Sequence, residues 1–260
     1  MRYSLLGGGK RLRPILALAA CEAVGGAPER AIGFACAVEM IHNYSLIHDD
    51  LPCMDDDDLR HGRPTNHKVY GDAMATLSGD GLLTDAFKVL ARSASDGVPS
   101  ALVLQAVADL ADAAGSAGMV GGQVIDLQGE GKSLTLDELK HLHAKKTGAL
   151  FLASIVGGAR LGGGTEHQLA NLNEYARALG LAFQVVDDLL DVEATTEQMG
   201  KRTRKDEAAG KATFPSLMGI DKSRQFAHDL ERQAHDALAD FGSAAAPLRA
   251  IATFVVERRQ

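Results

Sequence analysis

Residues 42–66 read HNYSLIHDDLPCMDDDDLRHGRPTN and contain an unusually dense group of carboxylates. Six of the ten residues from Asp49 to Asp58 are aspartates, placed between an apolar, helix-patterned run and a basic, turn-forming tail. Carboxylates this close repel one another unless solvent or bound cations offset their charge. Oxygen ligands of this kind suit Mg²⁺ or Mn²⁺. Taken alone, the stretch is equally consistent with a solvated acidic loop and with a metal site.

A second acidic group, Asp187, Asp188 and Asp191, lies in the strongly apolar segment FQVVDDLLDV. Asp187 and Asp191 are four residues apart, so a helix would place them on one face about 6 Å apart. Two carboxylates on an otherwise buried face are costly unless they are paired or bind a metal. Asp49 and Asp50 likewise end an apolar helix, and two such helices would hold carboxylates across a cleft of a helical bundle. Caps or ion pairs to neighbouring helices are the structural alternative.

The residue types around these two acidic groups favour Mg²⁺ over zinc, because no histidine-rich ligand set accompanies them. Magnesium keeps several waters and usually bridges protein carboxylates to substrate phosphates. The sequence therefore predicts a phosphate or diphosphate ester as the substrate.

Basic segments that could bind such an anion lie in three places. A glycine-rich run, GGGKRLRP, lets backbone amides approach an anion closely, and the helix that follows favours negative charge at its start. A lysine pair stands at an expected helix break, and a basic loop follows the second acidic group. Each segment could instead be a solvated turn or helix end. The basic residues in question are Lys10, Arg11, Arg13, Lys145, Lys146, Lys201, Arg202, Arg204, Lys205 and Lys211.

Two further polar residues share helix faces with the acidic groups. His42 lies seven residues before Asp49, and Gln184 lies three residues before Asp187. A lone histidine in such a position is more often structural than functional.

The composition is that of an ordinary soluble globular chain, with 260 residues, 46% hydrophobic and 23% charged residues and a net charge of -7. The acidic balance argues against a nucleic-acid binder. Cys21, Cys36 and Cys53 have no paired or metal-ligand spacing, which is typical of reduced thiols in the cytosol. No apolar run reaches the length of a membrane span, and the first residues lack the apolar core of a signal peptide. We therefore expect a cytoplasmic protein without a membrane span.

Apolar residues recur at three- and four-residue spacing, with seven prolines and no linker, which predicts one all-α domain over residues 1–260. Residues 115–131 are glycine-rich but keep the apolar pattern. Residues 200–215 should form a polar, basic loop. Breaks are expected near Thr147 and Gly148, and near Gly180. The predicted helices are 12–24, 28–51, 72–94, 98–114, 136–161, 166–193, 221–241 and 246–258.

These motifs, in this order, resemble the trans-isoprenyl diphosphate synthases, the farnesyl and geranylgeranyl diphosphate synthase family. GGGKRLRP looks like the family's GGKRxRP, and DDLPCMD looks like its first aspartate-rich motif in the form with two extra residues. GRPTNHKVYG, GMVGGQVIDL, KKTGAL, FQVVDDLLD and GKATFP also match. The resemblance runs from Tyr3 to the C-terminus and is greatest to bacterial farnesyl diphosphate synthases. It implies an all-α bundle around a deep central cleft, usually in a homodimer.

The resemblance also implies an activity, condensation of isopentenyl diphosphate with the allylic dimethylallyl and geranyl diphosphates. Farnesyl diphosphate is the expected product, and geranylgeranyl diphosphate is the alternative. Three Mg²⁺ ions would clamp the allylic diphosphate, with Mn²⁺ as a substitute. The implied metal residues are Asp49, Asp50, Asp55, Asp187, Asp188 and Asp191, of which Asp188 and Asp191 would support the second wall.

The substrate contacts follow from the same motif positions. The implied contacts to the allylic diphosphate are Arg60, Lys146 and Lys201, and those to isopentenyl diphosphate are Lys10, Arg13, His42 and the position of His61. Thr147 and Gln184 would line the reacting centre. The implied catalytic set is Asp49, Asp50, Arg60, Lys146, Thr147, Gln184 and Lys201.

Product length should depend on the residues one turn before Asp49, since the growing tail would run back along the same helix. Those residues are Ser45 and Tyr44. The tyrosine ring would form a floor, which is similar to the pattern of farnesyl (C15) synthases. Removing that ring should lengthen the product.

The chain departs from the family pattern in three places. His61 replaces an arginine expected to bind isopentenyl diphosphate, and a histidine is shorter and only partly charged near neutral pH. Arg204 stands where glycine is usual. The chain also begins close to GGGKRLRP, so we expect it to lack the family's most N-terminal helix. These departures leave open a weakly active or regulatory subunit of a heteromeric synthase, while the DDLLD wall disfavours a class I terpene cyclase.

Overall fold

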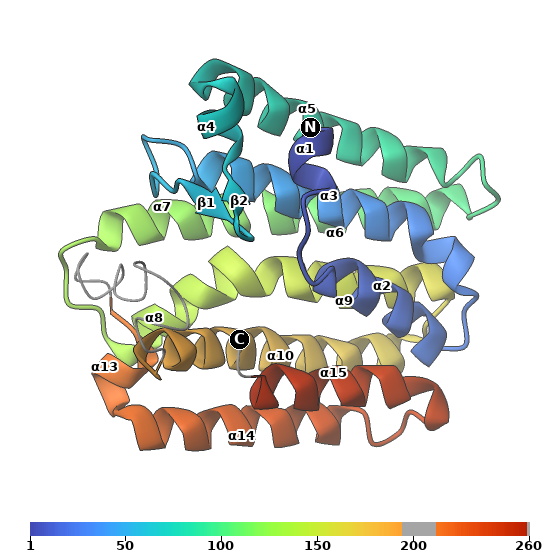
Figure 1. Ribbon diagram of the computed structural model, residues 1–260. Coiled ribbons are helices and arrows are strands. Elements are labelled where there is room, and N and C mark those ends of the chain that lie inside the picture. Colours follow the sequence, from blue (N-terminus) through green and yellow to red (C-terminus); the bar gives the residue numbers. More distant parts are fainter. Residues whose placement is uncertain (194–211, 259–260) are drawn as a thin grey trace.

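The computed structural model describes residues 1–193 and 212–258, and it confirms the predicted all-α class (Figure 1). None of the helices in these residues is long and apolar enough to cross a membrane. The helices are α1 (Arg2–Leu5), α2 (Leu12–Ala23), α3 (Ile32–Asp49), α4 (Asn66–Tyr70), α5 (Asp72–Arg92), α6 (Ser100–Ala114), α7 (Met119–Gly129), α8 (Leu136–His143), α9 (Ala149–Gly162), α10 (Glu166–Glu193), α13 (Phe214–Met218), α14 (Ile220–Ala237) and α15 (Ala246–Glu257), with short turns of 3₁₀ or π type at η1 (Pro28–Ala31), η2 (Ala144–Gly148) and η3 (Ser243–Ala245).

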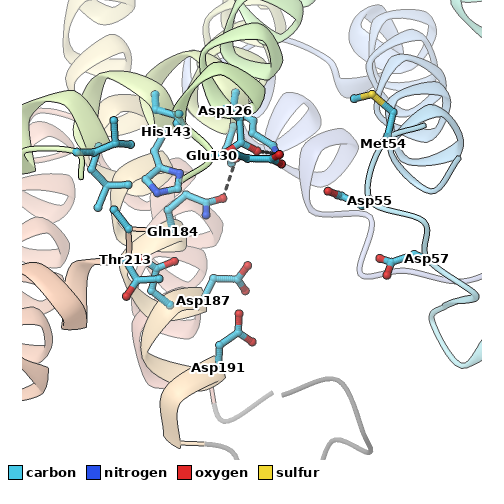
Figure 2. A pocket seen from close by; sticks show the side chains of 18 of the residues that line it. Met54, Asp55, Asp57, Asp126, Glu130, His143, Gln184, Asp187, Asp191 and Thr213 are labelled. Carbon is cyan, nitrogen blue, oxygen red and sulfur yellow. Dashed lines mark hydrogen bonds and ion pairs between the residues drawn. The ribbon is translucent and has the colours of Figure 1, made fainter. Parts of the chain in front are cut away.

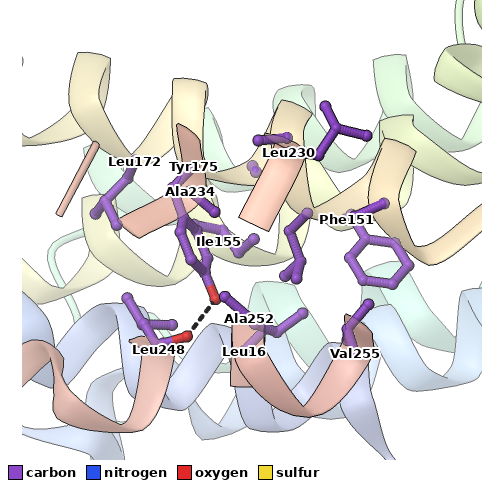
Figure 3. Close-up of a cluster of buried hydrophobic side chains, with 14 of the residues drawn as sticks. Leu16, Phe151, Ile155, Leu172, Tyr175, Leu230, Ala234, Leu248, Ala252 and Val255 are labelled. Atoms are coloured by element: carbon purple, nitrogen blue, oxygen red, sulfur yellow. Dashed lines mark hydrogen bonds between the residues drawn. The ribbon is translucent and has the colours of Figure 1, made fainter. Parts of the chain in front are cut away.

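Two apolar clusters hold the bundle together. One lies among α2, α9, α10, α14 and α15, and the other is built mainly from α3, α5 and α6. In the first cluster the buried Tyr175 hydroxyl donates to the Leu248 carbonyl at 2.7 Å, so its polar atom is satisfied inside the core (Figure 3). The central helices α2 and α9 approach so closely that a Cβ at Gly158 would lie 2.1 Å from the Ala17 carbonyl oxygen. Glycine is therefore required at this crossing.

The predicted break at Gly180 is wrong, because α10 runs unbroken from Glu166 to Glu193. Gly180 serves close packing instead of a turn. A Cβ there would lie 3.2 Å from the Cα of Gly148 and 3.5 Å from the Cβ of Phe151. The glycine thus lets α10 lie against the η2 turn, and this contact brings the second acidic group beside the lysine pair.

The predicted break near Thr147 is a π-helical turn, η2, which joins α8 to α9 without ending the helical run. Such turns insert one extra residue and are frequent at functional sites. A further correction concerns residues 59–64, where no strand was expected. They form a two-stranded antiparallel hairpin, β1 (Leu59–Arg60) and β2 (Arg63–Pro64).

The short helices α1, α4 and α13 were also not predicted. α13 begins within the expected loop 200–215, most of which lies outside the described residues. Pro215 occupies the first turn of α13, where its missing N–H is tolerated, and the Thr213 side chain caps the helix start.

Candidate active site

The two acidic groups lie on facing sides of one cleft with a volume of about 420 Å³ (Figure 2). Asp55 and Asp57 come from the loop after α3, and Asp187 and Asp191 come from the end of α10. Arg60, Lys146, Thr147 and Gln184 line the same cleft. The loop after α3 and the end of α10 therefore face one cleft, and the predicted roles of their aspartates stay predictions.

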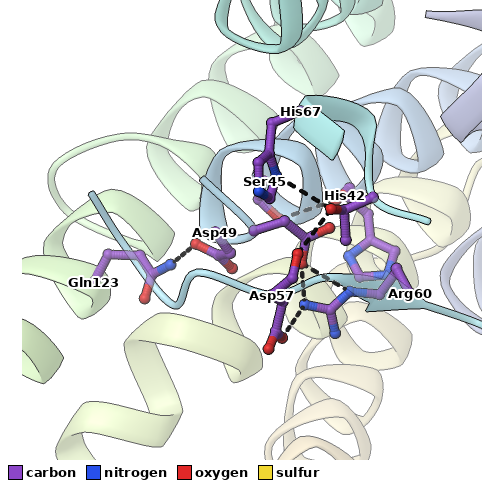
Figure 4. Close-up of polar contacts among 9 residues, drawn as sticks. His42, Ser45, Asp49, Asp57, Arg60, His67 and Gln123 are labelled. Atoms are coloured by element: carbon purple, nitrogen blue, oxygen red, sulfur yellow. Dashed lines mark hydrogen bonds and ion pairs between the residues drawn. The ribbon is translucent and has the colours of Figure 1, made fainter. Parts of the chain in front are cut away.

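Asp49 ends α3 beside this cleft, and its carboxylate accepts a hydrogen bond from the Gln123 side chain on α7 (Figure 4). Its pKa is raised to about 6, mainly by burial, with Lys146 opposing the shift and Asp55 adding to it. A buried carboxylate with a raised pKa is ionised more readily when a cation lies next to it. Lys146 therefore does not fully offset the cost of ionising Asp49, and a bound cation would favour the ionised form.

Asp50 is only 3% exposed and forms an ion pair with Arg60. Arg60 places Nη2 at 2.5 Å and Nε at 3.1 Å from Asp50 Oδ1, and Nη2 at 3.3 Å from Asp57. Burial raises the pKa of Asp50, and the bonds from Arg60 oppose that shift. Asp50, predicted to bind metal, and Arg60, predicted to bind the diphosphate, therefore form an ion pair with each other in this structure.

The β1–β2 hairpin holds Arg60 in place. Its two turn residues, His61 and Gly62, both have positive φ angles of 52° and 75°, which matches the turn type favoured by two-residue hairpins. Two further bonds tie the hairpin to the rest of the chain. Tyr3 donates to the Pro64 carbonyl at 2.8 Å, and Thr65 donates to the Asp57 carbonyl at 2.7 Å.

The second acidic group has partners that sequence spacing could not reveal. Asp187 accepts a hydrogen bond at 3.0 Å from Arg258, whose guanidinium lies 4.1 Å from the centre of the Phe183 ring. Asp188 is 8% exposed and accepts the Phe214 backbone N–H at 2.8 Å. One oxygen of Asp188 is therefore committed to α13. This bond is compatible with the supporting role predicted for Asp188, which lines the cleft together with Asp187 and Asp191.

The π-turn η2 presents Lys146 and Thr147 to the cleft. The Lys146 ammonium pairs with Asp126 of α7 at 2.5 Å, and the Thr147 hydroxyl donates to the Gln184 side chain at 2.7 Å. Lys145 has a different direction, since its ammonium donates to the Ala117 carbonyl at 2.8 Å. Of the lysine pair, only Lys146 is therefore part of the site.

A second set of groups, predicted to bind isopentenyl diphosphate, lies around the start of α2. Burial lowers the pKa of Arg13 to about 10, and its Nε has no hydrogen-bond partner among the described residues. The pKa of His42 falls well below 6.5 through burial and the positive charge of Arg13. Burial also lowers the pKa values of His61 and Lys10, with Arg60 and Arg258 adding to the respective shifts. A bound anion would oppose each of these shifts, because a nearby negative charge favours the protonated form.

Four residues of the site were not assigned a role from the sequence. Gln123 and Asp126 belong to the GMVGGQVIDL motif, whose glycines and amide were the available signal. Arg258 is remote in sequence from Asp187. His143 lines the cleft, stacks on Phe214 at 5.6 Å between ring centres, and has both ring nitrogens buried without a partner among the described residues. Burial lowers its pKa to about 4, so it is neutral at physiological pH.

The five basic residues predicted for the loop after α10 lie outside the described residues. They are Lys201, Arg202, Arg204, Lys205 and Lys211.

Comparison with known proteins places this chain in a family. The chain belongs to the polyprenyl synthetase family, whose model matches residues 1–244. It is a trans-prenyltransferase of the isoprenyl diphosphate synthase type. This confirms the resemblance drawn from the motifs and the predicted enzyme class.

The most informative relatives are plant and bacterial enzymes. The Arabidopsis thaliana protein named heterodimeric geranylgeranyl pyrophosphate synthase large subunit 1, chloroplastic, is 52% identical over 100% of this chain and 71% of its own length. The chloroplastic geranylgeranyl pyrophosphate synthase of Capsicum annuum is 52% identical, over 99% of this chain and 70% of its own. The structure of an FPP/GFPP synthase from Zymomonas mobilis aligns with a TM-score of 0.88 at 44% identity, covering 98% of this chain and 86% of its own.

These relatives correct one expectation. The predicted cytoplasmic location is contradicted, because the plant relatives carry chloroplastic in their names. Composition and cysteine usage separate compartments only by redox state, so they could not distinguish the cytosol from the interior of an organelle.

Proposed function

We propose that this enzyme condenses isopentenyl diphosphate with allylic diphosphates, with Mg²⁺, to make geranylgeranyl diphosphate (C20). The observation that carries the proposal is the pair of aspartate walls facing each other across one cleft, with Lys146 and Arg60 beside them. The C20 product takes precedence over the C15 product expected from Tyr44, because relatives 52% identical to this chain are named geranylgeranyl pyrophosphate synthases.

The side chains present fit Mg²⁺ shared with a substrate. Among residues 1–193 and 212–258, no three metal-ligating side chains converge into a ready-made cage. Magnesium needs none, because it keeps waters and takes part of its ligand shell from substrate phosphates. Asp49 and Asp55 on one wall, and Asp187 and Asp191 on the other, would hold the ions. Bound cations would neutralise the charge of the departing diphosphate.

The other residues of the cleft would bind the substrate and surround the reacting carbons. Lys146 and Arg60 would hold the allylic diphosphate, and in doing so they would exchange Asp126 and Asp50 for phosphate oxygens. The allylic carbon–oxygen bond breaks with its electron pair going to the diphosphate, and the isopentenyl double bond supplies the pair for the new carbon–carbon bond. A proton then leaves the neighbouring carbon, with the released diphosphate as its acceptor. Thr147 and Gln184, bonded to each other, would line the reacting centre.

The decisive test is direct incubation of the purified protein with Mg²⁺, isopentenyl diphosphate and dimethylallyl diphosphate. Chromatography of the dephosphorylated products should show geranylgeraniol as the main alcohol. A main product of farnesol would restore the C15 assignment. If the protein alone makes no prenyl alcohol but makes product when a partner subunit is added, it would be a subunit of a heteromeric synthase. One relative is named as the large subunit of such a heterodimer.

We expect the substitution His61→Arg to lower the KM for isopentenyl diphosphate by about 5- to 30-fold at pH 8, the effect of about 1–2 kcal/mol from a charged hydrogen bond. Burial and Arg60 lower the pKa of His61, so the wild-type imidazole is neutral there and gains charge only on acidification. Because the wild-type side chain gains charge at low pH and arginine does not, the ratio of the two KM values should shrink as pH falls.

Steady-state kinetics at pH 6 and pH 8, with the allylic substrate saturating, would measure both KM values. His61→Gln is the matched control, because it is neutral at both pH values and keeps a polar side chain in the turn. An unchanged KM in His61→Arg at pH 8 would remove His61 from the isopentenyl diphosphate site.

We further propose that the enzyme is a homodimer that pairs through α5. Met74 and Leu77 are 54% and 61% exposed and lie three residues apart on one face of α5, which runs along an outer edge of the bundle (Figure 1). Leu77→Lys should halve the mass measured by light scattering, because a charge would be buried at the contact. Ile32→Lys, at another half-exposed apolar position, should leave the mass at twice that of one chain. A wild-type mass of one chain would refute the proposal.

A further inference from the structure

The imidazole of His48 occupies space on α5 that only a glycine at position 79 leaves free. A Cβ on Gly79 would lie 2.1 Å from His48 Nε2 and 2.5 Å from Cδ2. Real Cβ atoms do not come this close to another heavy atom, so any larger residue at 79 would displace the ring. The two helices involved, α3 and α5, form the most extensive helix pair of the second apolar cluster.

Polar contacts from α5 fix the orientation of this ring. His48 Nε2 lies 3.0 Å from the Thr76 carbonyl oxygen, and because a carbonyl only accepts, Nε2 carries the hydrogen. The same nitrogen lies 3.9 Å from Asp80 Oδ1. His48 is therefore attached to α5 at its tip, while its backbone belongs to α3.

The His48 ring also contacts the ring of Tyr44, which lies one helical turn earlier on α3. The two rings meet edge to face, with centres 5.7 Å apart and planes at 78°. Tyr44 is only 6% exposed. With His48 seated on Gly79, the imidazole limits how far the Tyr44 ring can move on that side.

We propose that His48 and Gly79 are specificity-determining residues that set product length by fixing the ring of Tyr44. The inference rests on the proposed prenyl elongation and on a tail that runs back along α3 from Asp49. A smaller residue at 48 lets the Tyr44 ring tilt into the vacated space, which deepens the pocket for the tail. A larger residue at 79 pushes His48 against Tyr44, which makes that pocket shallower.

The two substitutions should shift the products in opposite directions. With Mg²⁺, isopentenyl diphosphate and dimethylallyl diphosphate, His48→Ala should raise the ratio of longer to shorter prenyl alcohols by at least about fivefold, the factor given by 1 kcal/mol. Gly79→Ala should lower that ratio by a similar factor. The double variant should return toward the wild-type ratio, because the added methyl group fills space that the imidazole leaves.

Tyr44→Ala tests the route of the effect. It should lengthen the product by itself, and adding His48→Ala should then change the ratio no further, since the two act through one ring. Gly81→Ala is the matched control, because its Cβ would meet only the flexible side chain of Met1, at 3.2 Å. It should keep the wild-type ratio.

Three outcomes would overturn the inference. They are an unchanged ratio in His48→Ala, a shift of the same sign in both single variants, and an undiminished effect of His48→Ala when Tyr44 is alanine. If Gly79→Ala fails to fold, the comparison of His48→Ala in the two Tyr44 backgrounds still decides. Failure of the proposed function has a different signature, namely no prenyl product from the wild-type protein.

Discussion

Replacing Asp49 by asparagine is expected to lower the rate of prenyl elongation by about 10³-fold, while the metal-free protein becomes more stable. The loss of rate follows from removing an anionic group that would hold a cation against the leaving diphosphate. The gain in stability follows from burial, which raises the pKa of Asp49 to about 6. Its ordinary pKa lies near 3.9, so the folded state opposes ionisation over the whole range between these values.

The sign of the pH dependence follows from this shift. A carboxyl whose pKa is raised on folding favours the native state below its unfolded pKa, and that advantage disappears as pH rises to the folded value. At pH 7 the metal-free wild type carries a buried charge that Asp49→Asn lacks. The Gln123 bond survives, since the amide oxygen of asparagine still accepts. The melting temperature of the variant should therefore be a few degrees higher at pH 7 and equal to that of the wild type near pH 4.

The measurement pairs kinetics with thermal unfolding, each with and without Mg²⁺ and inorganic diphosphate. These ligands should raise the melting temperature of the wild type and leave Asp49→Asn unchanged. Asp58→Asn is the control from the same acidic run. Its side chain is 63% exposed and pairs with Lys68 at 2.9 Å, away from the cleft. Near-normal turnover in Asp49→Asn, or an equal loss in Asp58→Asn, would show that the first metal wall is placed elsewhere.

Most of the helices could be predicted because their apolar spacing reports packing directly. The prediction failed where a residue has two structural uses. Gly180 suggested a turn, yet it allows close contact with Gly148 inside a continuous helix. The turn at His61 and Gly62 joins strands of two residues each, which are too short to show an alternating pattern.

The residues of the site were predictable one at a time, but their pairings were not. Helix spacing predicted no cationic partner for Asp187, because its partner Arg258 follows the end of α15, 71 residues later in the chain. The buried ion pair of Asp50 with Arg60 depends on the β1–β2 hairpin, which the local sequence pattern did not predict. Interactions between residues far apart in sequence are set by tertiary packing, so one sequence could suggest the groups but not their geometry.

The GMVGGQVIDL motif gains a physical meaning from α7, and Gly122 is the residue on which the next prediction depends. A Cβ at Gly122 would lie 2.3 Å from the Lys146 backbone nitrogen and 2.5 Å from its Cα. Gly122→Ala must therefore move η2 away from α7. A displacement of about 1 Å at a catalytic group can reduce the rate by about 10²-fold. We expect a fall of that size in kcat, with a smaller change in the KM for isopentenyl diphosphate, whose proposed contacts lie around α2.

Gly122→Ala also costs stability, because overpacking typically destabilises by about 1–3 kcal/mol. A chain that melts above the assay temperature and keeps its helical circular dichroism would separate misplacement from unfolding. Gly129→Ala adds the same methyl group at the end of the same helix, where the nearest atom is a Leu134 methyl at 3.7 Å. This control should retain nearly full activity.

The double variant with Lys146→Ala shows whether Gly122 acts through that lysine. If the η2 shift harms catalysis by misplacing the Lys146 ammonium, then Gly122→Ala should cost little once the ammonium is gone, because the two changes share one group. Independent losses that multiply would instead assign the effect to Thr147 or to the bundle as a whole. Thr147→Val then separates these cases, since it removes the hydroxyl bonded to Gln184 and keeps the volume of the side chain. A kcat for Gly122→Ala equal to that of Gly129→Ala would mean that η2 tolerates displacement, and that the glycine serves only the packing of α7.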